Sequence, residues 1–393
     1  MLILSGADVV QPDGVVGPYS IVADGDRIAE VRPGRLAASP GDRYLDLSGH
    51  LVVPGFVDVH VHGVDGVDVL DDPPAVARIA SGLPRYGVTS FCPTTVACDP
   101  IALARVLGEV RRLRASPPRG SARVLPAHLE SNFISAAYRG AQPLDMLRAP
   151  GEQMAGGFGA DEVLTEIARA PGEVAVVTVA PEIDGGVELV RALAAAGHRV
   201  SLGHSGASFD VGRAAIAAGA SQATHLFNGM PPLGHREPGL AGEVLADDRV
   251  AAELICDGIH VHPAMLHLVV AAKGASRVMA ITDGLSGSGR PEGSVCRLGG
   301  RTATVRQGAC YLPDGTLAGS AATFDAIFRV LIRDVGLPMA EAVCLSSTTP
   351  ALELGLADRG RIAPGLLADL VVLDRDLQVV WTFVGGVAAF GRR

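Results

Sequence analysis

The stretch PGFVDVHVHG at residues 54–63 decides the fold class. It is a short apolar run that Pro-Gly opens and Gly63 closes, which is typical of a buried β-strand. Successive side chains of a strand point to opposite faces, so His60 and His62 lie on one face at its end. Further apolar runs follow, separated by longer Ala-, Leu- and Arg-rich segments with helical periodicity. The pattern predicts parallel strands alternating with helices.

The predicted elements form eight βα units over roughly 300 residues, which is typical of a (β/α)8 TIM barrel of the metal-dependent hydrolase type. Strands are expected at 55–60, 88–94, 123–130, 173–180, 199–204, 222–225, 250–256 and 278–283. Helices are expected at 74–86, 100–114, 161–170, 186–196, 210–218, 263–272 and 321–335. A doubly wound sheet is the alternative, but its Gly-rich dinucleotide fingerprint is missing after the first strand.

Outside this region both ends of the chain carry short alternating runs broken by turn residues, such as the Asp-Gly of ADGDRI. We therefore expect one small β-sandwich domain built from both termini. Its halves would be residues 1–53 and 355–393, with the catalytic barrel at 54–354. The Gly-, Ser- and Arg-rich run 284–300 is expected to be a long loop after the last barrel strand.

Composition excludes several classes of function. With 48% hydrophobic residues among 393, the chain can bury a large core. Its 42 acidic and 33 basic residues give a net charge of −9, which argues against a nucleic acid or an anionic membrane as partner. The single lysine, Lys273, has no phosphate-loop context and lies in a predicted helix tail, which argues against Schiff-base chemistry.

The expected location is the cytoplasm. The 6 cysteines show no CxxC motif and are interpreted as reduced thiols. We see neither a signal peptide at the start nor an apolar run long enough to span a membrane.

Polar residues close five of the predicted barrel strands. Each has an ordinary explanation alone, because buried histidines often bond to the backbone and carboxylates often cap turns. Their joint position at the carboxyl ends of strands, where barrel enzymes carry their chemistry, favours a shared site. The residues are His60, His62, Glu130, His204, His225 and Asp283.

Imidazoles and a carboxylate suit Zn²⁺ or another borderline divalent ion. Such an ion lowers the pKa of water toward about 7. Asp283 could take a proton from that water and return it to a leaving group. The pattern therefore predicts metal-assisted hydrolysis.

Two further residues could contact substrate. Arg236 lies in a loop after the sixth strand and could bind a phosphate or carboxylate, although a solvated loop arginine is an equal alternative. His260 follows the seventh strand near the same rim. His262 and His267 are assigned to the next helix. The remaining histidines are interpreted as structural or exposed: His50, His128, His198 and His235.

Longer motifs extend over almost the whole chain, among them AHLES, LGHSGAS, THLFNGM, HREPGLAGE, ICDGIHVHP, ITDGL and LAGSAATFD. With them the sequence resembles the N-acetylglucosamine-6-phosphate deacetylase family of the amidohydrolase superfamily. The resemblance implies that Glu130, His204 and His225 hold the principal ion and that Asp283 is the general base and acid. His60 and His62 would allow a second ion bridged by Glu130. Zn²⁺ is expected first, with Fe, Mn or Co as alternatives.

The same resemblance implies an amino-sugar phosphate as the substrate, bound at the phosphate by Arg236 from a neighbouring subunit, and hence a homodimer. The other implied substrate contacts are Asn228, Gly229, His260, Leu317, Ala318 and Gly319.

The chain departs from the family pattern at Ser131, Asn132 and Gln142, where the family usually has Gly, Pro and His. We place Gln142 among the substrate contacts. These departures leave the sugar epimer open.

The expected reaction is deacetylation of N-acetylglucosamine 6-phosphate. The alternatives are deacetylation of another N-acetylated sugar, a cyclic-amide hydrolase or deaminase, and a non-catalytic relative.

Overall fold

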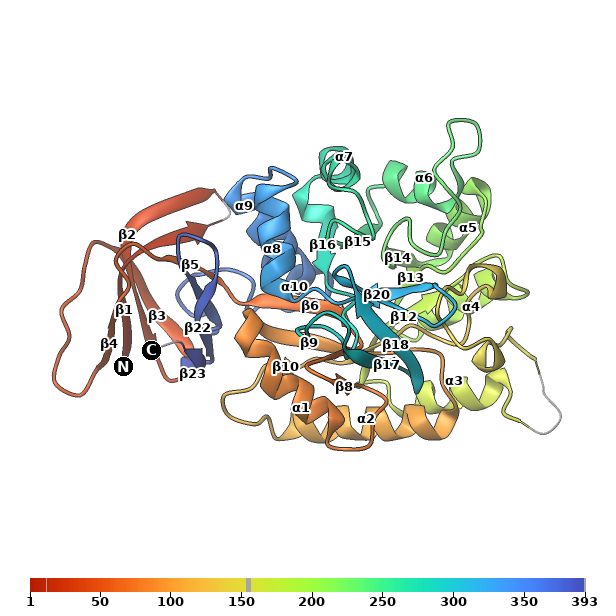
Figure 1. The fold of residues 1–393 in the computed structure, drawn as a ribbon, viewed down its shortest axis with the longest axis horizontal. Coiled ribbons are helices and arrows are strands. Elements are labelled where there is room, and N and C mark those ends of the chain that lie inside the picture. The colour runs from red at the N-terminus through yellow and green to blue at the C-terminus, as the bar shows by residue number, and fades with distance from the viewer. Residues whose placement is uncertain (12, 153–156, 392–393) are drawn as a thin grey trace.

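The computed structural model describes residues 1–11, 13–152 and 157–391. Eight parallel strands form the predicted barrel, in the order β6, β9, β11, β12, β13, β14, β15, β16 (Figure 1). The barrel closes just past β16, where the Asp283 backbone N–H donates to the His60 carbonyl at 3.0 Å. The strands are Phe56–Val61, Val88–Thr95, Ala127–Leu129, Val174–Val179, Arg199–Leu202, Ala220–Ala223, Ala251–Ile255 and Val278–Ile281. The (β/α)8 fold class is confirmed.

Helices follow the strands and cover the outside of the barrel. They are α1 (Ala75–Gly82), α2 (Pro100–Ala115), α3 (Ala160–Arg169), α4 (Gly186–Ala195), α5 (Phe209–Ala218), α6 (Gly239–Ala246), α7 (Pro263–Lys273), α8 (Phe324–Arg333), α9 (Met339–Val343) and α10 (Thr349–Glu353). Among the described residues, no helix is long and apolar enough to cross a membrane.

Helix α6 and the third barrel strand differ from the sequence prediction, and the short helices α9 and α10 were not predicted either. Helix α6 was not predicted, because two glycines in GLAGEVLA obscure its period. The predicted third strand is broken into β10 (Arg123–Val124) and β11 around Leu125 and Pro126, and proline has no N–H to give to a ladder.

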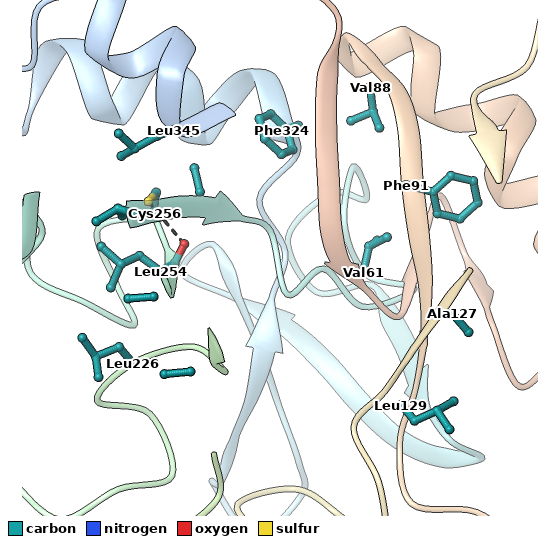
Figure 2. Packing of buried hydrophobic residues seen from close by; sticks show 14 of the residues in the cluster. Val61, Val88, Phe91, Ala127, Leu129, Leu226, Leu254, Cys256, Phe324 and Leu345 are labelled. Atoms are coloured by element: carbon teal, nitrogen blue, oxygen red, sulfur yellow. Dashed lines mark hydrogen bonds between the residues drawn. The ribbon is translucent and has the colours of Figure 1, made fainter. Parts of the chain in front are cut away.

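The outward faces of the strands pack on the helices in one apolar cluster. Figure 2 shows members of this cluster, among them Val61, Val88 and Phe91 from the first two barrel strands and Phe324 of α8. The Phe324 ring stacks on Phe56 with centroids 5.0 Å apart. Burying such a side chain stabilises the fold by about 1.5–3 kcal/mol. This apolar cluster between strands and helices holds in place the strand ends at which the predicted site lies.

The β domain joins strands from both ends of the chain, as expected (Figure 1). Its sheet runs β23-β22-β21-β5-β1-β2-β3, with β4 also paired to β1. Strand β1 changes its parallel partner from β4 to β5 around Gly6, which has a φ of 79°. The strands are β1 (Leu2–Gln11), β2 (Gly14–Asp24), β3 (Arg27–Pro33), β4 (Arg43–Asp46), β5 (Leu51–Pro54), β21 (Leu370–Leu373), β22 (Val379–Val384) and β23 (Val387–Gly391). The boundaries at 53/54 and 354/355 stay predictions.

The run 284–300 is not simply a loop, which corrects the sequence interpretation. It contains β17 (Val295–Leu298), the first strand of an antiparallel meander with β18 (Arg301–Arg306), β19 (Ala309–Tyr311) and β20 (Leu317–Ser320). Glycines flank the four-residue strand and hide it in the sequence. A bridge between Gly284 and Ser320 holds the meander over the end of β16.

Candidate active site

The structure brings Glu130, His204 and His225 together at the carboxyl ends of β11, β13 and β14. The Nε2 atoms of both histidines lie 2.8 Å from Glu130 Oε1 and 3.1 Å from each other. All three side chains are buried. They form one group of three candidate metal ligands.

His60 and His62 form a second group on the other side of Glu130. Their Nε2 atoms lie 3.2 Å apart and 3.4 and 3.2 Å from Asp283 Oδ1. Glu130 Oε2 lies 3.5 Å from His62 Nε2. The Glu130 carboxylate therefore stands between the two histidine pairs, where it could bridge two ions.

The hydrogen bonds behind these rings fit metal ligation. His62 Nδ1 donates to the Thr94 carbonyl at 3.1 Å, and His204 Nδ1 donates to the Tyr138 carbonyl at 2.8 Å. A carbonyl only accepts, so each neutral ring carries its hydrogen on Nδ1 and turns the Nε2 lone pair to the centre. The Nε2 atoms within each histidine pair lie 3.2 and 3.1 Å apart. Two lone pairs that face each other at this distance repel unless a cation lies between them. Nitrogens on one tetrahedral Zn²⁺ are roughly 3.3 Å apart, so the ligand set fits a divalent ion.

The backbone at three of these residues is unusual. His204, His225 and Asp283 have φ values of 47°, 30° and 46°, in the left-handed region. Each comes two residues after a barrel strand ends. Non-glycine residues adopt this conformation at a cost of order 1–3 kcal/mol, and such strain clusters at functional sites. It turns the side chains inward over the barrel mouth.

Electrostatics keep both carboxylates ionised. Burial alone would raise the pKa of Glu130, but the adjacent imidazoles, His204 first, hold this pKa well below its ordinary value. Burial opposes ionisation of Asp283 as well, yet the adjacent imidazoles, His62 first, lower the pKa of its carboxyl. Asp283 can therefore accept a proton at neutral pH.

These groups line a cavity of about 190 Å³ under the meander. Most of the predicted site residues line it: His62, Glu130, Gln142, His204, His225, Asn228, Gly229, His260, Asp283, Leu317, Ala318 and Gly319. His60 lies beneath the floor and is fully buried.

Arg236 is not brought into the cavity of its own chain. It is exposed in the segment between β14 and α6, which extends away from the barrel (Figure 1). Within one chain, the structure therefore does not place the predicted phosphate ligand beside the other site residues.

The departures from the family pattern have structural roles. Gln142 accepts from the Ala97 backbone N–H at 2.9 Å and donates to Glu130 Oε2, so its amide holds the central carboxylate. Ser131 donates to the Thr178 carbonyl at 2.6 Å. Asn132 donates to the Cys98 and Met146 carbonyls at 2.8 and 2.7 Å. Ser131 and Asn132 brace the loops around the cavity.

Sequence reasoning missed three polar residues under the floor. Glu253 accepts from His60 Nδ1 at 2.9 Å. Asp58 accepts from Thr282 Oγ1 at 2.6 Å, and burial raises the pKa of Asp58 to about 7. His128, interpreted above as structural or exposed, is buried with its ring centroid 4.6 Å from that of His60. Each lies on an apolar strand, and the two-residue spacings of Asp58 to His60 and His128 to Glu130 were signals for a shared face.

A closed parallel barrel with histidines and carboxylates converging at its carboxyl-terminal mouth defines a metal-dependent hydrolase class. The chain belongs to the amidohydrolase family, whose model matches residues 51–389. This confirms the resemblance seen in the sequence.

Several proteins similar to this chain over nearly its full length are deacetylases of amino-sugar phosphates. The N-acetylglucosamine-6-phosphate deacetylase of Bacillus subtilis (strain 168) is 34% identical over 99% of this chain and 97% of its own length. The N-acetylgalactosamine-6-phosphate deacetylase of Escherichia coli O157:H7 is 35% identical over 94% and 93%. A solved structure of the Mycobacterium smegmatis N-acetyl-D-glucosamine-6-phosphate deacetylase, substituted at one residue and in complex with N-acetyl-D-glucosamine-6-phosphate, has a TM-score of 0.89. It is 33% identical, and the match covers 99% of each chain.

Proposed function

We propose that this chain hydrolyses the acetamide of N-acetylglucosamine 6-phosphate to acetate and glucosamine 6-phosphate. The single observation that carries the proposal is the convergence of Glu130, two histidine pairs and Asp283 on one cavity. The similarity to deacetylases over nearly the full chain supports the choice of an acetamide over a cyclic amide. The ligand residues are all present, which disfavours a non-catalytic role.

Glu130, His204 and His225 would hold the principal ion, with Zn²⁺ as the first choice and Fe, Mn or Co as alternatives. His60 and His62 would hold a second ion, with Glu130 shared. When bound, a divalent ion supplies Lewis acidity, which polarises the acyl carbonyl and acidifies water.

Asp283 moves the proton in this scheme. Its Oδ1 takes the proton from the attacking water and gives it to the departing amine nitrogen, so that the amide C–N bond breaks without expelling an amide anion. Although the side chain is buried, the lowered pKa of Asp283 keeps the carboxylate ionised before the attack.

His260 and the meander would position the sugar. His260 Nδ1 is fixed by Asp257 Oδ2 at 2.6 Å. Its Nε2 is buried, without a hydrogen-bond partner among the described residues, and the residue lines the cavity. That nitrogen is available to a substrate oxygen. Asn228, Gly229, Gln142 and the segment 317–319 complete the walls.

Arg236 would bind the 6-phosphate in the cavity of a neighbouring subunit. Its exposed loop, and its position outside the cavity of its own chain, support a contact across a homodimer. We place the enzyme in amino-sugar metabolism in the cytoplasm.

The test is an acetate-release assay on N-acetylglucosamine and N-acetylgalactosamine, each with and without a 6-phosphate. We expect the highest kcat/KM for N-acetylglucosamine 6-phosphate. A preference for the galactosamine epimer would establish the second candidate, which the Escherichia coli relative favours. Equal rates without phosphate would contradict the phosphate assignment, and no acetate from any sugar would contradict the function.

A further inference from the structure

We propose that Glu253 is a positioning residue that orients His60 as a metal ligand and retains the ion at the His60–His62 site. The inference rests on the proposed function, because it concerns the ions of that same cavity. Nothing in the sequence motifs pointed to this residue.

Glu253 lies in the middle of β15, which reads AAELI. Alternation along the strand puts Ala251, Glu253 and Ile255 on the inner face of the barrel, where Ala251 and Ile255 join an apolar cluster with Val57 and Met279. The Glu253 side chain is 0% exposed. A carboxylate buried among such neighbours is costly unless it has a specific partner.

That partner is the ring of His60, whose Nδ1 donates to Glu253 Oε2 at 2.9 Å. The bond places the ring hydrogen on Nδ1 and leaves the His60 Nε2 lone pair facing Asp283 and His62. A carboxylate behind a metal-binding imidazole both fixes the ring and makes it a stronger ligand.

The other three imidazoles that would hold the ions lack this arrangement. His62 and His204 donate from Nδ1 to neutral carbonyls. His225 Nδ1 has no hydrogen-bond partner within the described ranges. The effect of Glu253 should therefore fall on the ion held by His60 and spare the ion held by His204 and His225.

Charge supports the same assignment. In the part of the chain that the structure describes, Glu253 forms no ion pair with arginine or lysine, and its other oxygen, Oε1, has no hydrogen bond. The second imidazole beside it is His128, whose Nδ1 lies 3.7 Å from Oε1. A divalent ion bound on the far side of the His60 ring would place near this buried carboxylate the positive charge that no arginine or lysine provides.

The experiment compares zinc binding by the wild-type chain, Glu253→Ala and Glu253→Gln. Each protein is stripped with chelator, reloaded with Zn²⁺ and analysed for ions per chain and for affinity in chelator competition. His60→Ala identifies the ion that depends on His60. Glu109→Ala and Glu109→Gln are matched controls, because Glu109 is also buried but lies outside the cavity on α2 and accepts from the Ala77 backbone N–H at 3.2 Å.

We expect Glu253→Ala to weaken the His60-dependent ion roughly 10–100-fold, with the other ion and both Glu109 controls unchanged. Glu253→Gln keeps an acceptor oxygen without the charge, so its loss should be smaller but measurable. If Glu253→Ala fails to fold, Glu253→Gln carries the test. Wild-type affinity for both ions in Glu253→Gln and in any folded Glu253→Ala would overturn the proposal, as would a wild type with no His60-dependent ion.

Acetate release is measured separately on the same wild-type sample. A chain that binds His60-dependent zinc but releases no acetate would contradict the proposed function alone. A chain that releases acetate with Glu253 variants of unchanged zinc affinity would contradict the role of Glu253 alone.

Discussion

Replacing Asp283 by asparagine separates proton transfer from metal binding. Asparagine has nearly the same size and tolerates the left-handed backbone, which has a φ of 46° at this position. It can still fill the space 3.2 Å from His62 Nε2 and 3.4 Å from His60 Nε2. A neutral amide cannot take the proton that the ionised carboxylate accepts, so the substitution removes one chemical step with little change in packing.

General acid–base catalysis contributes typically 10²- to 10⁴-fold to a rate. At 1.36 kcal/mol per tenfold change, this corresponds to about 3–5 kcal/mol of transition-state stabilisation. We therefore expect kcat for acetate release from N-acetylglucosamine 6-phosphate to fall by roughly this factor in Asp283→Asn, with KM little changed.

The assay records initial rates at saturating sugar phosphate, with ions per chain and the melting temperature measured on the same samples. The ion held by Glu130, His204 and His225 should remain. Turnover within a few-fold of the wild type, in a folded variant with that ion in place, would refute the assignment of Asp283.

Three further variants test other parts of the structure. Arg236→Ala should raise KM for the phosphorylated sugar by roughly 10–100-fold, the value of one charge-assisted contact, and an unchanged KM would exclude this arginine from phosphate binding. Lys273→Met should lower stability by about 1–3 kcal/mol in denaturant titration without changing kcat/KM, because the Lys273 ammonium donates to the Val244 and Asp247 carbonyls at 2.6 and 3.0 Å at the C-terminal end of α6. Wild-type stability of this variant would contradict the prediction. Asp247→Asn should lower the melting temperature at pH 7, because the hydrogen bond from Arg249 lowers the pKa of Asp247 to about 2 from 3.8. The pKa of Asp247 is lower in the folded chain than in the unfolded chain, so the contribution of Asp247 to stability is complete above about pH 4 and lost between about pH 4 and 2. A difference in melting temperature between wild type and variant that persists below about pH 2 would show another cause.

The barrel and the meeting of the candidate metal ligands at its mouth could be predicted from the topology of the fold. Parallel strands joined by helices bring their carboxyl ends to one face, so His60, Glu130 and His225 meet although they lie far apart in the sequence. The left-handed backbone at His225 could not be predicted, because local sequence does not specify it.

Other features depend on contacts made only in the folded chain. Glu253 is one acidic residue in an apolar strand, and its role follows from the register that sets it behind His60. Helix α6 and the short strand β17 carry too little periodicity for a prediction. The position of Arg236 depends on how its loop leaves the barrel.

The most direct test of metal-dependent deacetylation follows acetate from N-acetylglucosamine 6-phosphate before chelation, after chelation and after Zn²⁺ is returned. The structure predicts one acetate per glucosamine 6-phosphate formed, loss of turnover when the ion is removed, and recovery when it is restored. Undiminished acetate release from a chain shown to contain no divalent ion, or no acetate from a fully loaded chain, would contradict the account.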